Sequence, residues 1–280
     1  MTDDGSPLQR LRDVAVPPRG LVAAWLGQAG FIIRTPAMTA MIDPFLAPYR
    51  GREYESGLAP ADATGIDLVL CTHEHVDHLD ADSAPAIAAA SPQAVFVVPS
   101  PIVDMVTEAG IAPDRVVGLQ PGDPTELAGI RVRAVPAMHG VTMADAYGFG
   151  EDLSGGEIRF LGYVLDAGGV RLYHAGDTIH YPGMEEILGA LEIDVAMLPI
   201  NGRDAEREAR GIVGNLSERE AAWLATTIGA GTVIPMHYDL FARNRGYPEW
   251  LVESVSRDHP GPHVLVPARE KPFVLQPPTG

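Results

Sequence analysis

The chain has 280 residues, 46% of them hydrophobic, and a formal net charge of −17. Such an acidic surface repels a phosphate backbone, which argues against nucleic acid as a partner. No segment reaches the ~20 apolar residues that cross a bilayer, and the N-terminus lacks the basic and then apolar pattern of a signal peptide. The single cysteine, Cys71, cannot form an internal disulfide, and we expect a cytoplasmic protein.

Short apolar segments separated by turn residues are typical of β-strands. In chain order they cover residues 21–27, 30–35, 39–43, 66–72, 94–100, 115–119, 130–137, 160–167, 170–176, 193–200, 232–237 and 263–268. Several are entirely apolar, as expected for strands covered on both faces. Helical patterns are predicted at 83–90, 101–110, 182–192 and 217–231, and the last opens with Ser217 and Glu220 in the spacing of a capping box.

This order of elements indicates an α/β protein with two sheets, each faced by helices. No low-complexity linker divides the chain, so residues 1–280 are interpreted as one domain. Residues 49–65 and 147–160 are polar, glycine-rich and without periodicity. Loops of this length in a compact domain are usually functional, and we expect both to face the substrate.

The candidate metal ligands follow predicted strands. The first four come after strand 66–72 and one more follows each of three later strands: His73, His75, Asp77 and His78, then His139, Asp177 and His237. Because strand ends in α/β sheets meet at one edge, these side chains are expected to lie together. Seven nitrogen and oxygen ligands are too many for one metal and suit two divalent cations.

Ligand type suggests how the two sites divide. Three neutral imidazoles, from His73, His75 and His139, would leave one cation nearly all its charge. The second cation would take Asp77, His78 and His237, with Asp177 as a bridging carboxylate. Two cations ~3.5–4 Å apart can share a hydroxide, which makes hydrolysis the expected chemistry.

Other interpretations stay open for individual residues. His139 and His237 could each be hydrogen-bonded or buried structural histidines, and Asp177 could close a turn. Glu74, by alternation, is expected to point away from the site. Candidate substrate-binding residues are His180, Asn201, Arg203 and Asn215; Arg203 could hold a carboxylate or phosphate, or pair with Asp204 or Glu206.

The motif Thr-His-Glu-His-Val-Asp-His at 72–78 resembles the HxHxDH signature of the metallo-β-lactamase superfamily, and His139, Asp177 and His237 follow in the order of that family's later ligand motifs. The segments IDLVLCTHEHVDHLD, LYHAGDTIHY, IDVAMLPINGR and VIPMHYDLF are most similar to the branch that contains the L-ascorbate-6-phosphate lactonases. The resemblance implies a four-layer αβ/βα sandwich and a dinuclear centre with zinc or manganese. It also suggests a homo-oligomer.

The expected function is a metal-dependent hydrolase that acts on a small molecule, a lactone or related ester. The nucleophile would be a dinuclear-metal-bound hydroxide, and the catalytic residue Asp77 would orient it. The alternative within the same fold is a phosphodiesterase or phospholipase D-like hydrolase. A redox enzyme with iron is a further alternative; flavin-coupled relatives carry a glutamate where this chain has His75, which argues against it. A non-enzymatic binder is disfavoured because all seven ligand positions are filled.

Overall fold

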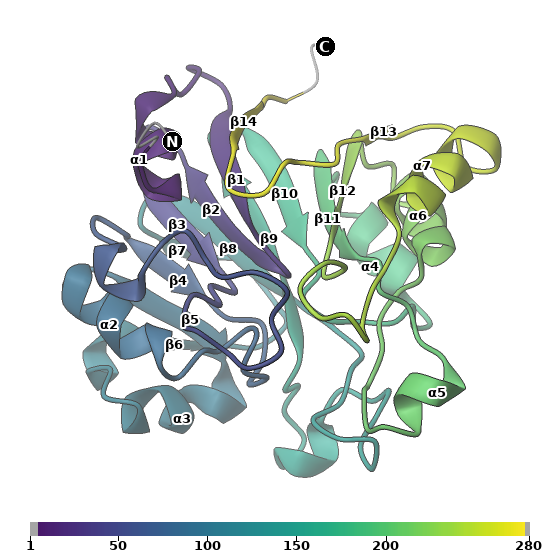
Figure 1. Cartoon of the computed structure of the whole chain (residues 1–280), viewed down its shortest axis with the longest axis horizontal. Coiled ribbons are helices and arrows are strands. Elements are labelled where there is room, and N and C mark those ends of the chain that lie inside the picture. The colour runs from purple at the N-terminus through teal and green to yellow at the C-terminus, as the bar shows by residue number, and fades with distance from the viewer. Residues whose placement is uncertain (1–4, 278–280) are drawn as a thin grey trace.

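The computed structural model describes residues 5–277 and contains two seven-stranded sheets (Figure 1). The first sheet has the order β14 (Pro272–Leu275), β1 (Leu21–Gly27), β2 (Gly30–Arg34), β3 (Thr39–Ile42), β4 (Leu68–Leu70), β5 (Val95–Pro99) and β6 (Val116–Leu119). Strands β14 to β3 pair antiparallel, and β3 to β6 pair parallel.

The second sheet repeats this design. Its order is β13 (His263–Val264), β12 (Thr232–Met236), β11 (Val195–Pro199), β10 (Val170–His174), β9 (Leu161–Ala167), β8 (Ile130–Pro136) and β7 (Thr125–Leu127). Strands β10 to β13 pair parallel, and β7 to β10 pair antiparallel. In both sheets the antiparallel hairpins come first in the chain and the parallel strands follow; β14, which pairs antiparallel with β1, is the exception.

Helices cover the outer faces of the two sheets (Figure 1). On the side of the first sheet lie α1 (Pro7–Asp13), α2 (Ser83–Ala90) and α3 (Val103–Glu108); on the side of the second lie α4 (Met184–Gly189), α6 (Glu218–Thr227) and α7 (Pro248–Arg257). The short helix α5 (Ala205–Glu208) projects from the second half, and 3-10 turns occupy Pro60–Asp62, Ser100–Ile102, Pro113–Arg115 and Glu151–Leu153. Between residues 5 and 277 no helix has the length and hydrophobicity needed to span a membrane.

The alternation of side chains explains why the central strands are apolar on both faces. Along β1, Leu21, Ala23 and Trp25 enter the core between the sheets, whereas Val22 and Ala24 enter a second core beneath α1, α2 and α3. Each such strand buries both of its faces, which is the condition for a sheet in the interior of a layered protein. The expected four-layer αβ/βα sandwich is therefore confirmed.

Five elements were absent from the sequence prediction: α1, α7, α5, β7 and β14. The first two carry ordinary signals, since Ser6 caps α1 and Pro248 occupies the first turn of α7. Strand β14, by contrast, is defined by its pairing with β1, about 250 residues away in the chain, for example Leu21 with Leu275. Local sequence does not encode such a pairing.

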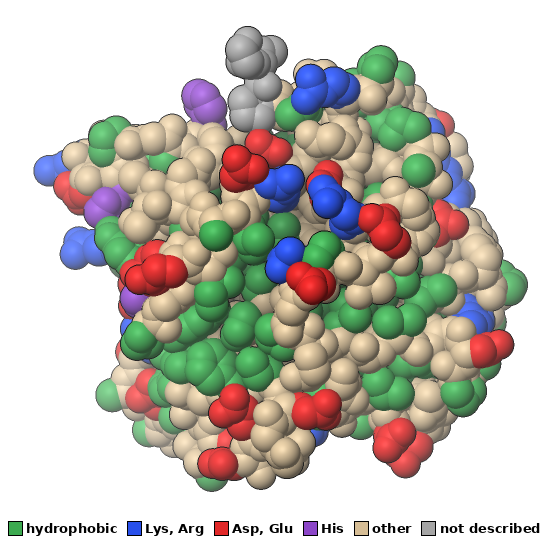
Figure 2. Space-filling view, turned by 180° about the vertical axis from the view of Figure 1, so that it is seen from behind, with side chains coloured by type: hydrophobic (Ala, Val, Ile, Leu, Met, Phe, Trp, Pro, Cys, Tyr) green, Lys and Arg blue, Asp and Glu red, His purple; other side chains and the backbone are tan. Residues whose placement is uncertain are grey.

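The face opposite to the view of Figure 1 shows basic side chains lying beside acidic ones in its upper half and a broad area of hydrophobic side chains below them (Figure 2). The acidic excess of the chain is therefore distributed among neutral and basic neighbours on this face rather than gathered in one uniform patch.

Candidate metal centre

The segment after β4 turns tightly and brings its histidines together. The amides of His78 and Leu79 both donate to the carbonyl oxygen of His75, at 2.9 and 2.8 Å. This turn places Nε2 of His73 2.9 Å from Nδ1 of His75, and the rings of His73 and His78 lie 4.1 Å apart between centroids. Such close packing of three imidazoles at the end of one strand is favourable when their nitrogen lone pairs bind cations.

The three later ligand candidates also follow strands. His139 lies beyond the end of β8, Asp177 beyond β10 and His237 directly after β12. Gly176 adopts a φ of +60°, and a Cβ at this position would come within 2.8 Å of both the carbonyl oxygen of Leu161 and Cβ of Thr72. Glycine is therefore required for the chain to turn and present Asp177 to the histidines.

The structure brings the seven candidate ligands into two groups. One consists of His73, His75, His139 and Asp177, and the other of Asp77, His78 and His237; within each group the ligand atoms lie within 4.8 Å of one another. Asp177 lies between the groups. Its Oδ2 is 3.5 Å from Nε2 of His139 and 3.2 Å from Nε2 of His237, and its Oδ1 is 3.4 Å from Nε2 of His78.

Several buried atoms at this centre have no hydrogen-bond partner among the described residues. They include Nε2 of His78 and Oδ1 of Asp177, the two atoms that face each other across the centre. A buried polar atom without a partner costs free energy, whereas a cation between the two would use both lone pairs. The donor set of imidazoles and carboxylates thus fits divalent transition metals in both groups.

The two groups differ in their electrostatics. Burial is the largest cause that lowers the pKa of His73 and His139, the latter to about 3, so both imidazoles are neutral and present lone pairs. Burial also acts on His237, but Asp177 and Asp77 outweigh it and raise its pKa to about 9. A proton on His237 therefore balances the negative charge of Asp77 and Asp177, and binding of a cation there must release that proton.

The carboxylates respond in the opposite sense. Burial by itself would raise the pKa of Asp77 and of Asp177, yet the neighbouring His78 and His237 outweigh it and hold both values below the ordinary range. Both side chains are thus anionic and suited to bind a cation. Burial likewise opposes the charged form of His78, but Asp177 and Asp43 dominate and raise its pKa well above the usual value.

Asp43, which the sequence analysis did not select, supports the second group from behind. It is completely buried, and Oδ2 accepts hydrogen bonds from Nδ1 of His78 at 2.7 Å and from Oγ1 of Thr72 at 2.8 Å, while Oδ1 accepts from the Thr72 amide at 2.8 Å. A carboxylate at Nδ1 fixes the tautomer of the ring and leaves the lone pair of Nε2 for a metal. The local signal was a single aspartate at the end of an apolar strand.

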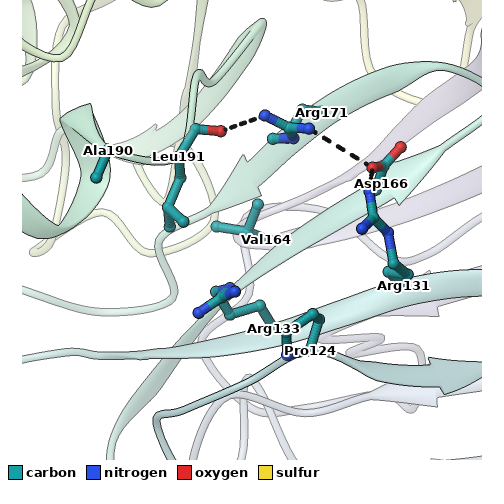
Figure 3. A pocket seen from close by; sticks show the side chains of 8 residues that line it. All are labelled: Pro124, Arg131, Arg133, Val164, Asp166, Arg171, Ala190 and Leu191. Carbon is teal, nitrogen blue, oxygen red and sulfur yellow. Dashed lines mark hydrogen bonds and ion pairs between the residues drawn. The ribbon is translucent and has the colours of Figure 1, made fainter.

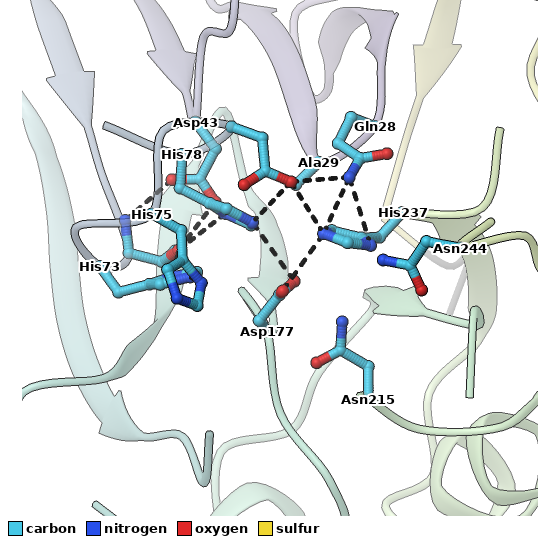
Figure 4. Close-up of polar contacts among 12 residues, drawn as sticks. Gln28, Ala29, Asp43, His73, His75, His78, Asp177, Asn215, His237 and Asn244 are labelled. Carbon is cyan, nitrogen blue, oxygen red and sulfur yellow. Dashed lines mark hydrogen bonds and ion pairs between the residues drawn. The ribbon is translucent and has the colours of Figure 1, made fainter. Parts of the chain in front are cut away.

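Gln28 is the second residue that sequence reasoning missed. It lies in the β1–β2 turn, and its Nε2 donates to Oδ2 of Asp77 at 2.7 Å and lies 3.0 Å from Nε2 of His237. Its backbone is held as well, because its amide donates to Asp239 and its carbonyl accepts from the amide of His237. Figure 4 shows Gln28 next to His237 and Asp177 between His237 and His78.

Backbone conformation is unusual at the same place. Gln28, Asp43 and His237 have φ values of 52°, 45° and 57°, in the left-handed region that residues with a side chain rarely occupy. Such conformations persist where the surrounding structure fixes them, and they concentrate at functional sites. Here all three residues contact the ligand cluster or belong to it.

A cavity of about 490 Å³ lies over the cluster. Five of the seven candidate ligands line it, namely His75, Asp77, His139, Asp177 and His237. Its size lies within the range of small-molecule sites, which is about 300–1,000 Å³. Because Asp77 lies at the wall of this cavity, its carboxylate can reach a bound molecule.

The four predicted substrate-binding residues lie elsewhere. His180 faces Glu185, with Nε2 3.1 Å from its Oε2, and Arg203 makes two hydrogen bonds to Glu220, at 2.8 and 2.6 Å, rather than to Asp204 or Glu206. Asn201 and Asn215 are buried and hydrogen-bonded to each other. In the described part of the chain none of the four lines the cavity, and a role in substrate binding stays a prediction.

The two long loops differ in where they lie. Residues 49–65 meet the loop after β12, where the amide of Glu53 donates to the carbonyl of Leu240, and they contribute Tyr49 to the cavity. Residues 147–160 contribute none of its lining. There Arg159 pairs with Glu74, with 2.6 Å between Nε and Oε1, so Glu74 is a partner of this loop and lies outside both ligand groups.

A second hollow, of about 180 Å³, lies on the outer face of the second sheet (Figure 3). Its arginines are held by their surroundings. Arg171 donates to the carbonyl of Leu191 at 2.8 Å, Arg133 donates to the carbonyl of Gly122 at 2.7 Å, and Arg131 pairs with Asp166. No candidate metal ligand lines this hollow, so the cavity over the ligand cluster is the candidate active site.

Comparisons with known proteins agree with this geometry. The beta-lactamase superfamily domain matches residues 39–238, a range that contains all seven candidate ligands. A UPF0173 metal-dependent hydrolase of Caldivirga maquilingensis is 30% identical over 246 residues, which are 86% of this chain and 92% of that protein. The probable L-ascorbate-6-phosphate lactonase UlaG of Salmonella newport is 29% identical over 198 residues, which are 69% of this chain and only 54% of that protein.

Solved structures show the same architecture. The metallo hydrolase Igni18 of Ignicoccus hospitalis has a TM-score of 0.71 at 22% identity, over 92% of this chain and 99% of that one. An isothiocyanate hydrolase from Delia radicum gut bacteria has a TM-score of 0.70 at 18% identity, over 91% and 99%. The chain therefore belongs to the beta-lactamase superfamily and has the metallo-β-lactamase fold.

Proposed function

We propose that the protein is a metal-dependent hydrolase that opens a lactone or a related ester. The observation that carries the proposal is the pair of ligand groups joined by Asp177 at the floor of a cavity of small-molecule size. Two relatives support it by name, one as a metal-dependent hydrolase and one as a probable lactonase.

The assignment of ligands follows the two groups. His73, His75 and His139 would hold one divalent cation, Asp77, His78 and His237 a second, and Asp177 would contribute an oxygen to each. The donor set suits zinc, manganese or iron. Such cations would supply an activated water as the nucleophile and would polarise the bond that it attacks.

The side chains of this chain would then position the reactants. Asp77 lines the cavity, and the hydrogen bond from Gln28 fixes its Oδ2, so that the carboxylate would orient the attacking water and carry a proton to the leaving group. Asp43 would keep His78 in the tautomer that ligates through Nε2. The apolar residues around the cavity would exclude bulk water from the reacting bond.

The direct test is a turnover screen with purified protein loaded in parallel with zinc, manganese or iron. Lactones, carboxylic esters, phosphodiesters and N-acyl lipids are the substrates, and acid release is followed with a pH indicator. The proposal predicts metal-dependent opening of at least one lactone or ester. Cleavage of phosphodiesters alone would favour the phosphodiesterase alternative, and no metal-dependent hydrolysis in any class would refute the proposal.

A further inference from the structure

The wall of the cavity above the ligand cluster is largely apolar. Beyond the ligands, its side chains are mostly aliphatic or aromatic: Tyr49, Val76, Val141, Ile212, Val213 and Phe241. Tyr49 and Val76 are 44% and 39% exposed, so part of this apolar wall faces open solvent. A polar, hydroxyl-rich substrate would lose its hydration against such a wall without gaining hydrogen bonds.

The polar groups of the wall outside the ligands are few, and one of them is an unpaired cation. Arg243 lines the cavity and is exposed, and within residues 5–277 no acidic side chain or carbonyl pairs with its guanidinium. In the neighbouring polar side chain, Asn244, the acceptor Oδ1 already receives hydrogen bonds from Asn201 and Arg207. Arg243 is thus a charged group of the wall that remains available to an anionic ligand.

The surroundings of Arg243 are basic although the chain is strongly acidic. A hollow of about 280 Å³ adjoins the cavity and shares Arg243 with it; four arginines and two acids line it, together with Ala242 and Tyr247. Both acids are already paired, Asp204 with Arg207 at 2.6 Å and Glu206 with Arg210 at 2.7 Å. Arg245 pairs with Glu53 at 3.2 Å, so one of the four arginines, Arg243, is left without an acidic partner, in a protein whose net charge is −17.

From these observations we propose that the substrate is an amphiphilic anion, with an apolar body against the wall of the cavity and a negatively charged end group at Arg243. The inference rests on the proposed function, because it places the scissile bond over the ligand cluster. A guanidinium without a partner binds a carboxylate, sulfonate or phosphate through charge-assisted hydrogen bonds. The apolar side chains add affinity in proportion to the length of the apolar body.

The test measures binding rather than turnover, so that it is independent of the reaction. Straight-chain alkane-1-sulfonates from butane to decane, below their micelle concentrations, are titrated into the holoprotein by isothermal calorimetry. Arg243→Gln tests the contact with the charged end of the sulfonate, and Ile212→Ser tests the contact of its alkyl chain with the apolar wall. Controls are Arg219→Gln, an exposed arginine that lines a different hollow, and Ile187→Ser on the surface of α4.

In the wild type the affinity is expected to rise about two- to fourfold for each added methylene. Arg243→Gln should weaken every sulfonate by about tenfold, and Ile212→Ser should reduce the gain per methylene, while both controls match the wild type. An affinity that does not depend on chain length, or equal effects of Arg243→Gln and Arg219→Gln, would overturn the inference.

The two proposals can fail separately. One outcome is metal-dependent ester hydrolysis with sulfonate affinities that depend neither on chain length nor on Arg243. It would support the proposed hydrolase function and refute the amphiphilic substrate. The expected binding pattern without hydrolysis in any substrate class would support the anion site and refute the hydrolase.

Discussion

Replacement of Asp43 by asparagine tests the role of the residue behind the second ligand group. Oδ1 of Asp43 accepts the Thr72 amide, so the carbonyl oxygen of an asparagine would take that place and its amide nitrogen would replace Oδ2. That nitrogen would face Nδ1 of His78, which now donates at 2.7 Å. To avoid two opposed donors, the ring must accept at Nδ1 and carry its proton on Nε2, the atom that faces Asp177.

The expected effect follows from this change of tautomer. With a cation at Nε2 of His78, the ring must carry its proton on Nδ1, where it opposes the asparagine amide. Loss of such a supporting carboxylate typically weakens metal binding by about 10–100-fold. Affinity for the cation that His73, His75 and His139 would hold should change less, since Asp43 reaches this group only through Oγ1 of Thr72, which lies 3.0 Å from Nδ1 of His73. Stability should fall by about 2–4 kcal/mol because Oγ1 of Thr72 loses its acceptor and the buried hydrogen bond from His78 to Asp43 is lost.

The assay is competition for the metal with a chromophoric chelator, which resolves two affinities per chain. Asp80→Asn is the matched control, because Asp80 is also a buried carboxylate that accepts backbone amides, such as that of Ala47 at 3.1 Å, but contacts no ligand. Asp43→Asn should lose affinity in one of two sites, whereas Asp80→Asn should keep both. Equal losses in both variants, or two unchanged affinities in Asp43→Asn, would refute the reasoning about the tautomer.

Further predictions concern the reaction and the electrostatics around it. Asp77→Asn should lower turnover by about 10²–10⁴-fold with an unchanged circular dichroism spectrum, and wild-type activity would show that Asp77 has no catalytic role. Gln28→Leu removes the hydrogen-bond donor that lies 2.7 Å from Asp77. We expect kcat to fall about tenfold while the metal content stays constant. A lower metal content in this variant would indicate a purely structural role instead. Burial raises the pKa of Glu220, but its bonds from Arg203 and Ser217 outweigh burial and lower it. The stabilisation is therefore present above the unfolded pKa of about 4.3 and lost as the pH falls. In Arg203→Gln the free energy of unfolding in urea should depend less on pH between about pH 5 and 3, by less than ~1 kcal/mol because the pair is partly exposed. KM should be unchanged, and a raised KM would support the substrate role predicted from sequence.

Much of the ligand cluster was predictable because its signals are local. Residues 71–78 concentrate histidines and acids after an apolar segment, and His139, Asp177 and His237 each follow a strand that the apolar pattern identifies. Strands that end at the same edge must bring such residues together, whatever the details of the loops. The structure groups all seven in the division expected from ligand type, with Asp177 shared.

The residues that support the ligands could not be predicted in the same way. Gln28 reaches Asp77 because the β1–β2 turn of the first sheet lies against the end of β12 in the second, as the bond from the amide of His237 to the carbonyl of Gln28 shows. That contact depends on how two sheets pack, which no local pattern encodes. For Arg203 the local sequence suggested two acidic partners, Asp204 and Glu206. The fold instead pairs it with Glu220, which lies farther along the chain.

The metal content of the protein tests the central claim most directly. Protein purified without added metal is analysed for zinc, manganese and iron by mass spectrometry with inductively coupled plasma. The account predicts two equivalents of divalent metal per chain, and one in a His139→Ala variant that retains its fold. A metal-free preparation with the native circular dichroism spectrum and full hydrolytic activity would contradict it.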